Sequence, residues 1–267
     1  MLSLVPTPIG NLEDVTLRAL RVLREADMIA CEDTRTSSVF LRRYGISAPL
    51  VSFHLHNEKE RLPQLLQALR EGKNVAVISD AGTPGISDPG FLLLQAALEE
   101  GLEADALPGP SALLPALLLS GLPPHPFFFY GFPPEKPGVR KALFASLADA
   151  PWTLVFYVSP HKAERQVSEM REIFGDRRAA LVREISKVYQ EAIRGTLSDI
   201  LSRLALGVKG EMVLLVAGRL EDPEDEDWRL FADELLAQGM RGRTVVEEVM
   251  AHCCASRNSV KDYVMKR

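Results

Sequence analysis

The segment SDAGTPGISDPG, residues 79–90, combines the residue types that build a binding loop. Its three glycines let the main chain approach a ligand or adopt positive φ, while Pro84 and Pro89 stiffen the segment. Asp80 and Asp88 offer carboxylates to ligand hydroxyl or amino groups, and Asp88 also suits a cap for the helix that follows. The segment lacks the Gly-Lys-Ser/Thr ending of a P-loop. It therefore predicts a preformed cradle of backbone amides, with a long turn held by Asx caps as the plainer alternative.

Two further clusters of reactive residues follow expected strands. Residues 7–11, Thr-Pro-Ile-Gly-Asn, offer a second main-chain cradle, and an ordinary Pro-Gly turn explains them equally well. Residues 32–35, Glu-Asp-Thr-Arg, place two carboxylates and a guanidinium at the expected carboxyl edge of a sheet, where α/β proteins bind ligands. Helix capping by Asp33 or Thr34 is the alternative for this second cluster.

The remaining candidates are weaker when each is taken alone. His54 and His56 share one face of an expected strand, but no further ligand stands near them in the sequence, so no metal site is expected. Glu184 and Lys187 follow a later strand, where they form either part of a site or only a surface ion pair.

The composition is that of a folded protein without a membrane segment. The 267 residues are 46% hydrophobic and 25% charged, and the formal net charge of -5 disfavours a nonspecific nucleic-acid coat. No apolar run approaches the ~18 residues of a membrane span, and the first residues lack the pattern of a secretory signal. Cys31, Cys253 and Cys254 show neither zinc nor disulfide spacing. We therefore expect a cytoplasmic protein with reduced thiols and no bound metal.

Short apolar runs alternate with amphipathic stretches, which is typical of α/β layering. The proline- and aromatic-rich residues 121–134 predict a stiff connector between two domains, and the strands expected beyond it indicate a more antiparallel sheet. The acidic residues 221–227 predict a solvated linker before a few short helices. The predicted organisation is an N-terminal α/β domain over residues 1–122, a second α/β domain over residues 123–220, and a linker with a small helical appendage over residues 221–267.

Several ordered motifs, at characteristic spacing, are shared with one family. They are TPIGN at 7–11, EDTR at 32–35, HxHNE at 54–58, SDAGTPGISDPG at 79–90, PGPSA at 108–112, SGLP at 120–123, GFPP at 131–134, PHK at 160–162 and KGEMVLLV at 209–216. Over about residues 2–218 the chain resembles the small-subunit ribosomal RNA 2'-O-methyltransferases (RsmI), a branch of the tetrapyrrole-methylase-like enzymes that use S-adenosylmethionine. It departs from the family pattern at Val158, where a glutamate is common.

The resemblance implies a fold of two α/β domains with S-adenosylmethionine bound in the cleft between them, usually in a homodimer. It also implies methyl transfer to the ribose 2'-hydroxyl of a cytidine in the decoding region of 16S rRNA, within the small ribosomal subunit. The cofactor-binding residues implied in this way are Asp80, Ala81, Gly82, Thr83, Ile86, Ser87, Pro110, Ser111, Ala112, Phe156 and Tyr157. The residues implied to face the RNA are Thr7, Pro8, Asn11, His54, His56 and Asn57.

A ribose hydroxyl is a poor nucleophile while it is protonated, so a base or a cation beside the oxygen should assist the transfer. The candidates for this catalytic role, which the sequence leaves unranked, are Glu32, Asp33, Arg35, Glu184 and Lys187. The cations expected to pair with RNA phosphates are Arg18, Arg21, Arg42, Arg43, Lys136, Arg140 and Lys141. Two alternatives remain open: a small-molecule methyltransferase of the tetrapyrrole type, and a noncatalytic RNA-binding protein, which the acidic net charge disfavours.

Overall fold

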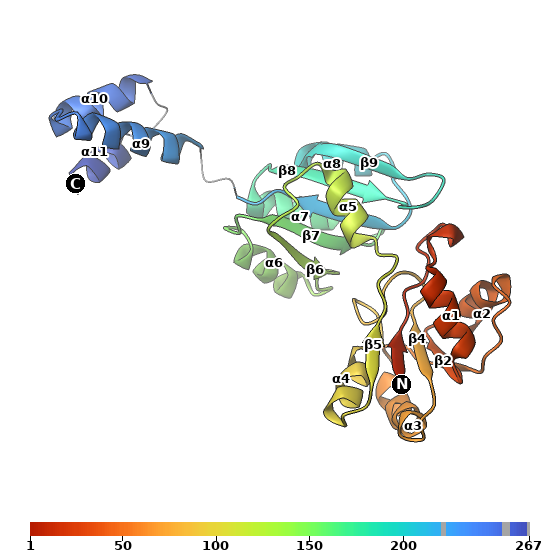
Figure 1. The fold of residues 1–267 in the computed structure, drawn as a ribbon. Coiled ribbons are helices and arrows are strands. Elements are labelled where there is room, and N and C mark those ends of the chain that lie inside the picture. The colour runs from red at the N-terminus through yellow and green to blue at the C-terminus, as the bar shows by residue number, and fades with distance from the viewer. Residues whose placement is uncertain (220–222, 253–256, 266–267) are drawn as a thin grey trace.

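The computed structural model describes residues 1–219, 223–252 and 257–265, and it shows two α/β domains followed by a unit of three helices (Figure 1). The first domain holds a five-stranded parallel sheet in the order β3-β2-β4-β1-β5. From β1 the chain leads to β2 and β3 on one side of the sheet and to β5 on the other. At such a switch point, the loops that leave the carboxyl ends of the central strands β4 and β1 diverge and open a crevice. The strands are β1 (Leu2–Leu4), β2 (Met28–Cys31), β3 (Leu50–Ser52), β4 (Val75–Ile78) and β5 (Ala104–Ala106).

Helices cover both faces of this first sheet. Alternate strand residues point to opposite faces, so Val77 packs with α3 and α4 while Ile78 packs with α1 and α2. Both faces are therefore buried, as the continuous apolar run at β4 predicts for a parallel sheet. The elements are α1 (Leu17–Glu25), α2 (Thr34–Arg43), α3 (Glu58–Arg70) and α4 (Phe91–Glu99), with a short 3-10 helix at Leu12–Asp14.

The second domain holds a mixed sheet in the order β6-β7-β10-β8-β9. Only β6 and β7 run parallel, and the other neighbours are antiparallel, which confirms the antiparallel character expected for this half. The strands are β6 (Phe127–Gly131), β7 (Thr153–Val158), β8 (Arg178–Arg183), β9 (Glu191–Thr196) and β10 (Met212–Val216). The helices α6 (Pro137–Ser146), α7 (Ala163–Phe174) and α8 (Leu197–Leu204) pack on one face.

Helix α5 (Leu113–Ser120) packs on the opposite face of the second sheet, through Ala116 and Leu117. The chain thus crosses to the second domain before α5, ahead of the boundary expected at residue 122. The expectation that residues 121–134 form only a stiff connector is wrong, because the aromatic run in this segment forms the edge strand β6. Aromatic residues favour strands, and an edge position tolerates the prolines that flank this one.

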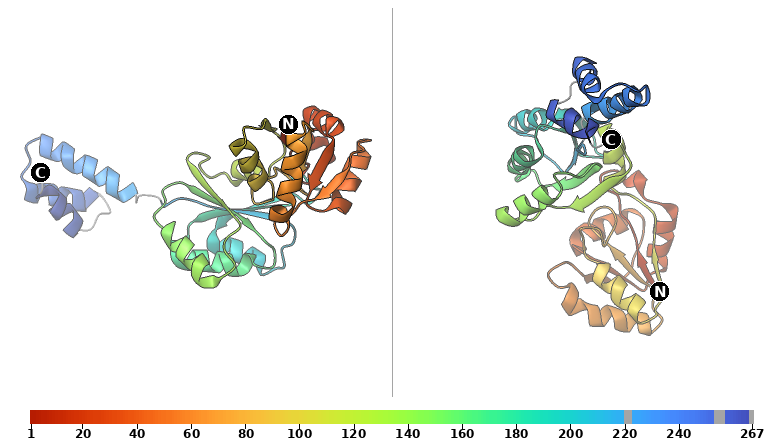
Figure 2. Two further views of the ribbon diagram at one scale, coloured as in Figure 1. Left: turned by 90° about the horizontal axis from the view of Figure 1, so that it is seen from below. Right: turned by 90° about the vertical axis from the view of Figure 1, so that its left-hand side faces the viewer.

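The last described residues form a helical unit with its own core. Trp228 is buried against Val245, Val249 and Val260, which joins α9 (Pro223–Ala237), α10 (Gly242–His252) and α11 (Arg257–Val264) in one bundle (Figure 2). The acidic residues 221–227 predicted a linker, but helix α9 already begins at Pro223, inside that segment. The expectations for residues 221–222, Cys253 and Cys254 fall outside the described residues, whereas Cys31 is a buried free thiol. Within the described ranges, no helix combines the length and apolarity needed to cross a bilayer.

Candidate functional site

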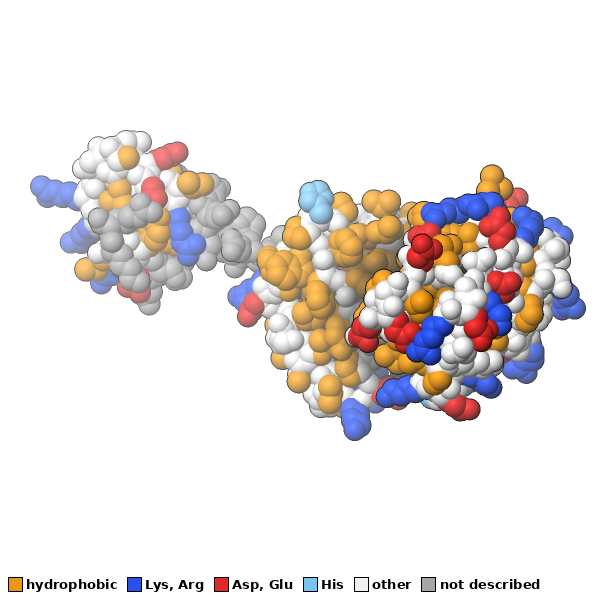
Figure 3. Space-filling view, turned by 60° about the horizontal axis from the view of Figure 1, so that its bottom comes forward, with side chains coloured by type: hydrophobic (Ala, Val, Ile, Leu, Met, Phe, Trp, Pro, Cys, Tyr) orange, Lys and Arg blue, Asp and Glu red, His pale blue; other side chains and the backbone are white. Residues whose placement is uncertain are grey.

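A cavity of about 530 Å³ lies between the two α/β domains. The loops after β1, β2 and β4 form its wall on the first domain, and β7, the loop after β8 and the start of β10 form its wall on the second. Figure 3 shows hydrophobic side chains gathered over the second domain, next to the hollow that separates it from the first. The cavity therefore occupies the crevice that the strand order of the first sheet predicts.

The loop at 79–90 is held in place before any ligand arrives. Thr7 and Gly82 exchange two backbone hydrogen bonds of 2.9 Å each, and the Thr7 hydroxyl donates to the Ser79 carbonyl at 3.0 Å. The Thr83 hydroxyl donates to the Pro110 carbonyl at 3.1 Å. These bonds tie together the loops after β1, β4 and β5, so the cradle is preorganised.

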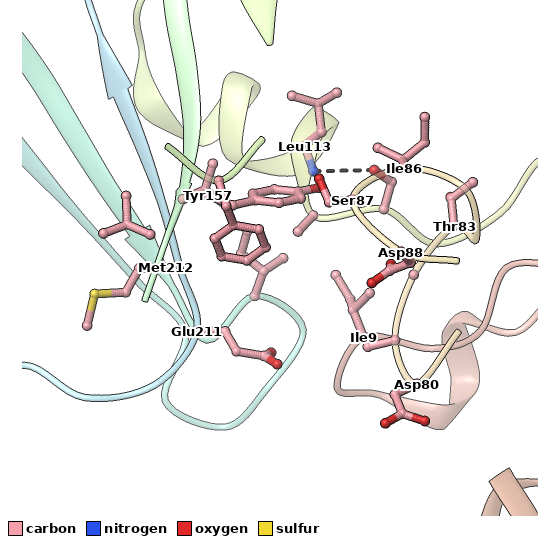
Figure 4. Close-up of a pocket in the computed structure, with 18 of the residues that line it drawn as sticks. Ile9, Asp80, Thr83, Ile86, Ser87, Asp88, Leu113, Tyr157, Glu211 and Met212 are labelled. Atoms are coloured by element: carbon pink, nitrogen blue, oxygen red, sulfur yellow. Dashed lines mark hydrogen bonds between the residues drawn. The ribbon is translucent and has the colours of Figure 1, made fainter. Parts of the chain in front are cut away.

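Gly82 has a φ of 85°, a conformation that disfavours side chains, and a Cβ there would lie 3.5 Å from Ile9 Cγ2. Gly90 has a φ of 128° and occupies the N-cap position of α4, which receives no side-chain cap. The expectation that Asp88 caps this helix is therefore wrong. Its carboxylate instead points into the cleft, opposite that of Glu211 (Figure 4).

Three carboxylates line the first-domain wall of the cavity: Glu32, Asp80 and Asp88. Burial, together with the negative charges of Glu32 and Asp80, raises the pKa of Asp88 to about 7. Burial followed by the Asp80 charge raises the pKa of Glu32, and burial also raises that of Asp80. No cation among the described residues forms an ion pair with these three groups, so this wall favours a positively charged ligand.

Asp33 and Arg35 do not line the cavity. Asp33 is the N-cap of α2, where its carboxylate accepts a hydrogen bond from the Arg35 amide at 2.8 Å. The Arg35 guanidinium also donates to Asp33, at 3.2 and 2.9 Å, and these bonds lower the pKa of Asp33 to about 2. A carboxylate stabilised in its charged form is a weak base, so among the acidic candidates of this motif Glu32 is the better placed.

Glu184 and Lys187 lie in the loop after β8, beside the cavity. Lys187 Nζ donates to Glu184 Oε1 and to Glu211 Oε2, at 2.9 Å in each case. The loop touches the first domain at Gly10, where an added Cβ would lie 2.4 Å from Lys187 Cγ. Glu211 and Ile185 line the cavity, whereas Glu184 and Lys187 do not. The pair therefore stands at the joint between the domains.

The residues implied to face RNA lie outside the cavity lining. Thr7 is only 3% exposed, and its hydrogen bonds make it a structural tie between loops. Asn57 precedes α3 without a side-chain cap bond, because its oxygen accepts from the His54 amide at 2.8 Å. The His54 and His56 rings lie 6.0 Å apart, and His56 is exposed. No cluster of metal ligands occurs among the described residues.

Most residues implied to bind the cofactor line the cavity; the exceptions are Pro110 and Phe156. The assignment of Phe156 is wrong because neighbouring strand residues face opposite ways: Tyr157 faces α5 and the cavity, while Phe156 is buried beneath α6 and α7. The sequence reasoning also missed lining residues, among them Leu113, Phe129, Phe132, Ile185, Glu211 and Met212. Ile9 and Asp88 line the cavity too; both belong to the two predicted cradles but were not assigned to the cofactor. Phe132 belongs to the motif GFPP, and Glu211 and Met212 belong to the motif KGEMVLLV. The motifs indicated these two segments, but not which of their side chains face the cavity.

One expected RNA contact is also wrong. Arg140 is only 3% exposed, and its guanidinium donates to Glu169 at 2.6 and 2.8 Å and to the carbonyls of Pro134 and Glu135. Its donors are engaged inside the second domain, so it is not available to phosphates. Its place on an otherwise amphipathic helix gave no sign of this burial.

Comparisons with known proteins agree with the geometry. The profile of the tetrapyrrole (corrin/porphyrin) methylases matches residues 1–201. The protein named ribosomal RNA small subunit methyltransferase I from Streptococcus pyogenes serotype M3 is 46% identical over 226 residues, which cover 84% of this chain and 79% of the relative. The proteins of the same name from Micromonospora olivasterospora and Bacillus subtilis are 42% and 38% identical, cover 98% and 100% of this chain, and are themselves covered to 86% and 90%.

The chain belongs to the ribosomal RNA small subunit methyltransferase I family. Two solved structures share its fold. A cobalt precorrin-4 methyltransferase superposes with a TM-score of 0.60 at 18% identity, over 81% of this chain and 94% of its own. A uroporphyrin-III-C-methyltransferase from Thermus thermophilus gives 0.58 at 23% identity, over 81% and 93%. At these identities the likeness establishes the tetrapyrrole methylase fold.

Proposed function

We propose that the protein transfers a methyl group from S-adenosylmethionine to the 2'-hydroxyl of a cytidine ribose in the decoding region of 16S rRNA, in the cytoplasm. The observation that carries the proposal is the interdomain cavity, with a rigid main-chain cradle on one wall and aromatic side chains on the other. The names of the relatives support a ribosomal RNA substrate.

The cavity suits the donor in size and chemistry. Its volume of about 530 Å³ lies in the range of small-molecule sites. Phe129, Phe132 and Tyr157 offer flat apolar surfaces for an adenine ring, and the rings of Phe129 and Tyr157 are 4.9 Å apart in an edge-to-face arrangement. The carboxylate of Asp80 complements a cationic ligand. S-adenosylmethionine, when bound, supplies a methyl group activated by its positive sulfur.

The protein's own contribution is to align the two reactants and to exclude water. The loops tied together by Thr7 and Thr83 fix the first wall, so little ordering is needed on binding. Glu32 lines the cavity and is the best placed of the catalytic candidates in its motif. Arg35 is 90% exposed at its side chain and stands ready to orient the RNA, while Lys187 braces the opposite wall.

RNA is expected to approach from the first-domain side of the cleft. Arg42 and Arg43 end α2, whose first turn holds the motif at 32–35, and Lys136 precedes α6 on the second domain. His54, His56 and Asn57 lie in the loop before α3. The charge of His54 acts to lower the pKa of Glu32, which links this loop electrostatically to the cavity. The overall acidic charge makes such local cations necessary for RNA binding.

The test is methyl transfer from tritiated S-adenosylmethionine to three acceptors: small ribosomal subunits that lack the modification, naked 16S rRNA, and uroporphyrinogen. We expect label in the subunits or the rRNA, mapped to one cytidine 2'-oxygen in the decoding region. Label on a base, on another RNA or on uroporphyrinogen alone would contradict the proposal. No binding of the donor in calorimetry would favour a noncatalytic RNA-binding protein instead.

We further propose that the enzyme works as a homodimer, formed through the outer face of α5. Leu114 and Leu118 lie one turn apart on this helix and are 56% and 73% exposed, although Ala116 and Leu117 pack inward on the second sheet. A helix that is apolar on both sides is typically covered on both sides. Light scattering is expected to show a dimer that Leu118→Lys converts to a monomer, and an unchanged mass for the variant would contradict this interface.

A further inference from the structure

The carboxylate of Asp88 lies inside the cavity and has no task in holding the fold. It does not cap α4, because Gly90 takes the N-cap position. No described residue donates a hydrogen bond to it, and no described cation forms an ion pair with it. A carboxylate that is partly buried without any partner is unfavourable for stability, so its presence at this position calls for a role in function.

Asp88 also stands between the two groups of residues that the reaction must bring together. On one side it interacts electrostatically with Glu32 and Asp80, at the strand ends from which RNA is expected to approach. On the other side its charge acts on the phenol of the half-buried Tyr157, on the wall suited to the donor. The charged and titratable groups that face Asp88 are thus the carboxylates of Glu32, Asp80 and, across the cleft, Glu211, together with the Tyr157 phenol.

We propose that Asp88 accepts the proton of the ribose 2'-hydroxyl during methyl transfer, an inference that rests on the function proposed above. The ribose oxygen forms its bond to the methyl carbon as the carbon–sulfur bond breaks, and the electron pair of that bond stays on sulfur. The hydroxyl proton passes to the Asp88 carboxylate, which becomes neutral and later releases the proton to solvent. One positive charge on sulfur and one negative charge on Asp88 are consumed together, so charge is balanced within the cavity.

The other acidic candidates are less free to take this proton. Asp33 is engaged by Arg35 and lies outside the cavity. Glu32 lines the cavity, but the backbone amide of Asp80 donates to it and the charge of His54 favours its ionised form. For Asp88, every influence favours the protonated form, and its pKa of about 7 lies close to a physiological working pH. A general base works best when its pKa lies near the pH at which it acts.

The variant Asp88→Asn tests the proposal, with Asp88→Glu as the conservative change. Asp149→Asn is the matched control, because that exposed carboxylate pairs with Arg219 and neither residue lines the cavity. With small subunits at saturating donor, Asp88→Asn is expected to slow single-turnover methylation at least about 100-fold, as for the loss of a general base. Donor affinity measured by calorimetry should stay within about threefold, Asp88→Glu should retain part of the rate, and the control should match the wild type.

The sign of the pH dependence follows from the base being active when ionised. The wild-type kcat/KM should rise with pH up to about 7 and then level off, whereas that of Asp88→Asn should be flat over this range. A readout independent of activity is 13C NMR of aspartate-labelled protein, in which one carboxyl signal should titrate near pH 7 and vanish in Asp88→Asn.

Four results would overturn the proposal. A rate for Asp88→Asn within threefold of the wild type, or an unchanged pH profile, would remove Asp88 from the reaction while leaving the proposed function intact. A loss of donor affinity equal to the loss of rate would make Asp88 a binding residue for the cation. No ribose methylation by the wild-type enzyme would refute the proposed function at the first step, and this inference with it.

Discussion

Replacing Gly10 by alanine probes the joint that sets the two walls of the cleft relative to each other. The added Cβ would lie 2.4 Å from Lys187 Cγ and 3.1 Å from the Ile185 carbonyl. Because Cγ lies near the root of its side chain, Lys187 must leave its rotamer to make room. Lys187 Nζ holds Glu184 and Glu211 at 2.9 Å each, so both ion pairs are expected to break.

The cost follows from those two pairs. Partly exposed ion pairs contribute about 0.2–1 kcal/mol each, so the loss of two is expected to lower the free energy of unfolding of Gly10→Ala by about 0.4–2 kcal/mol. Lys187→Ala loses the same pairs and should cost about as much. Alanine at position 187 also removes the clashing Cγ, so the double variant should cost little more than Lys187→Ala alone. The expected coupling free energy is therefore about 0.4–2 kcal/mol.

The assay is urea unfolding of the wild type, both single variants and the double variant, followed by circular dichroism, with donor binding measured by calorimetry. Gly138→Ala is the control, because nothing lies within 4 Å of a Cβ at that position. Donor affinity should fall in Gly10→Ala, since Ile185 and Glu211 line the cavity. Strictly additive costs in the double variant would refute the view that Gly10 and Lys187 form the joint.

Three other variants test separate parts of the structure. Arg140→Leu should lower the free energy of unfolding by about 3 kcal/mol, because the buried Glu169 then keeps only its pair with the exposed Arg165. Lys141→Leu, which loses only a surface pair with Glu172, should cost about 0–1 kcal/mol; equal costs in urea unfolding would contradict this account. Thr83→Val deletes the hydrogen bond to Pro110, worth about 1 kcal/mol, and should weaken donor binding in calorimetry about fivefold. Trp228→Ala should destabilise the helical unit by about 3–5 kcal/mol. Limited proteolysis should then cut within residues 223–265 and spare residues 1–219, whereas cleavage spread over both domains would show that this core is shared.

The sequence predicts the binding loop well because the signals there are local. An apolar run without alternation marks β4 as a buried strand, and glycines and prolines directly after it mark a rigid turn. The strand order places the ends of β1 and β4 beside each other. The motifs at 7–11 and 79–90, which each predict a main-chain cradle, are joined into one by the hydrogen bonds of Thr7 to Ser79 and Gly82.

The features that the sequence could not supply depend on contacts between distant residues. The burial of Arg140 depends on Glu169, which lies on another helix. Phe156 was placed wrongly because the sequence does not say which face of the second sheet lines the cavity. Of the neighbours Phe156 and Tyr157 on β7, either could have faced it. Asp88 is free because Gly90, and not Asp88, takes the N-cap position of α4. An aspartate three residues before a helix is equally compatible with a cap in the sequence pattern, so only the structure shows this.

The most direct test of the central claim is a crystal structure with S-adenosylmethionine or its demethylated product bound. The account predicts the ligand between the main chain at residues 81–83 and the ring of Tyr157, with its sulfur facing Asp88. Side chains that close this cavity, or a ligand bound elsewhere on either domain, would contradict it.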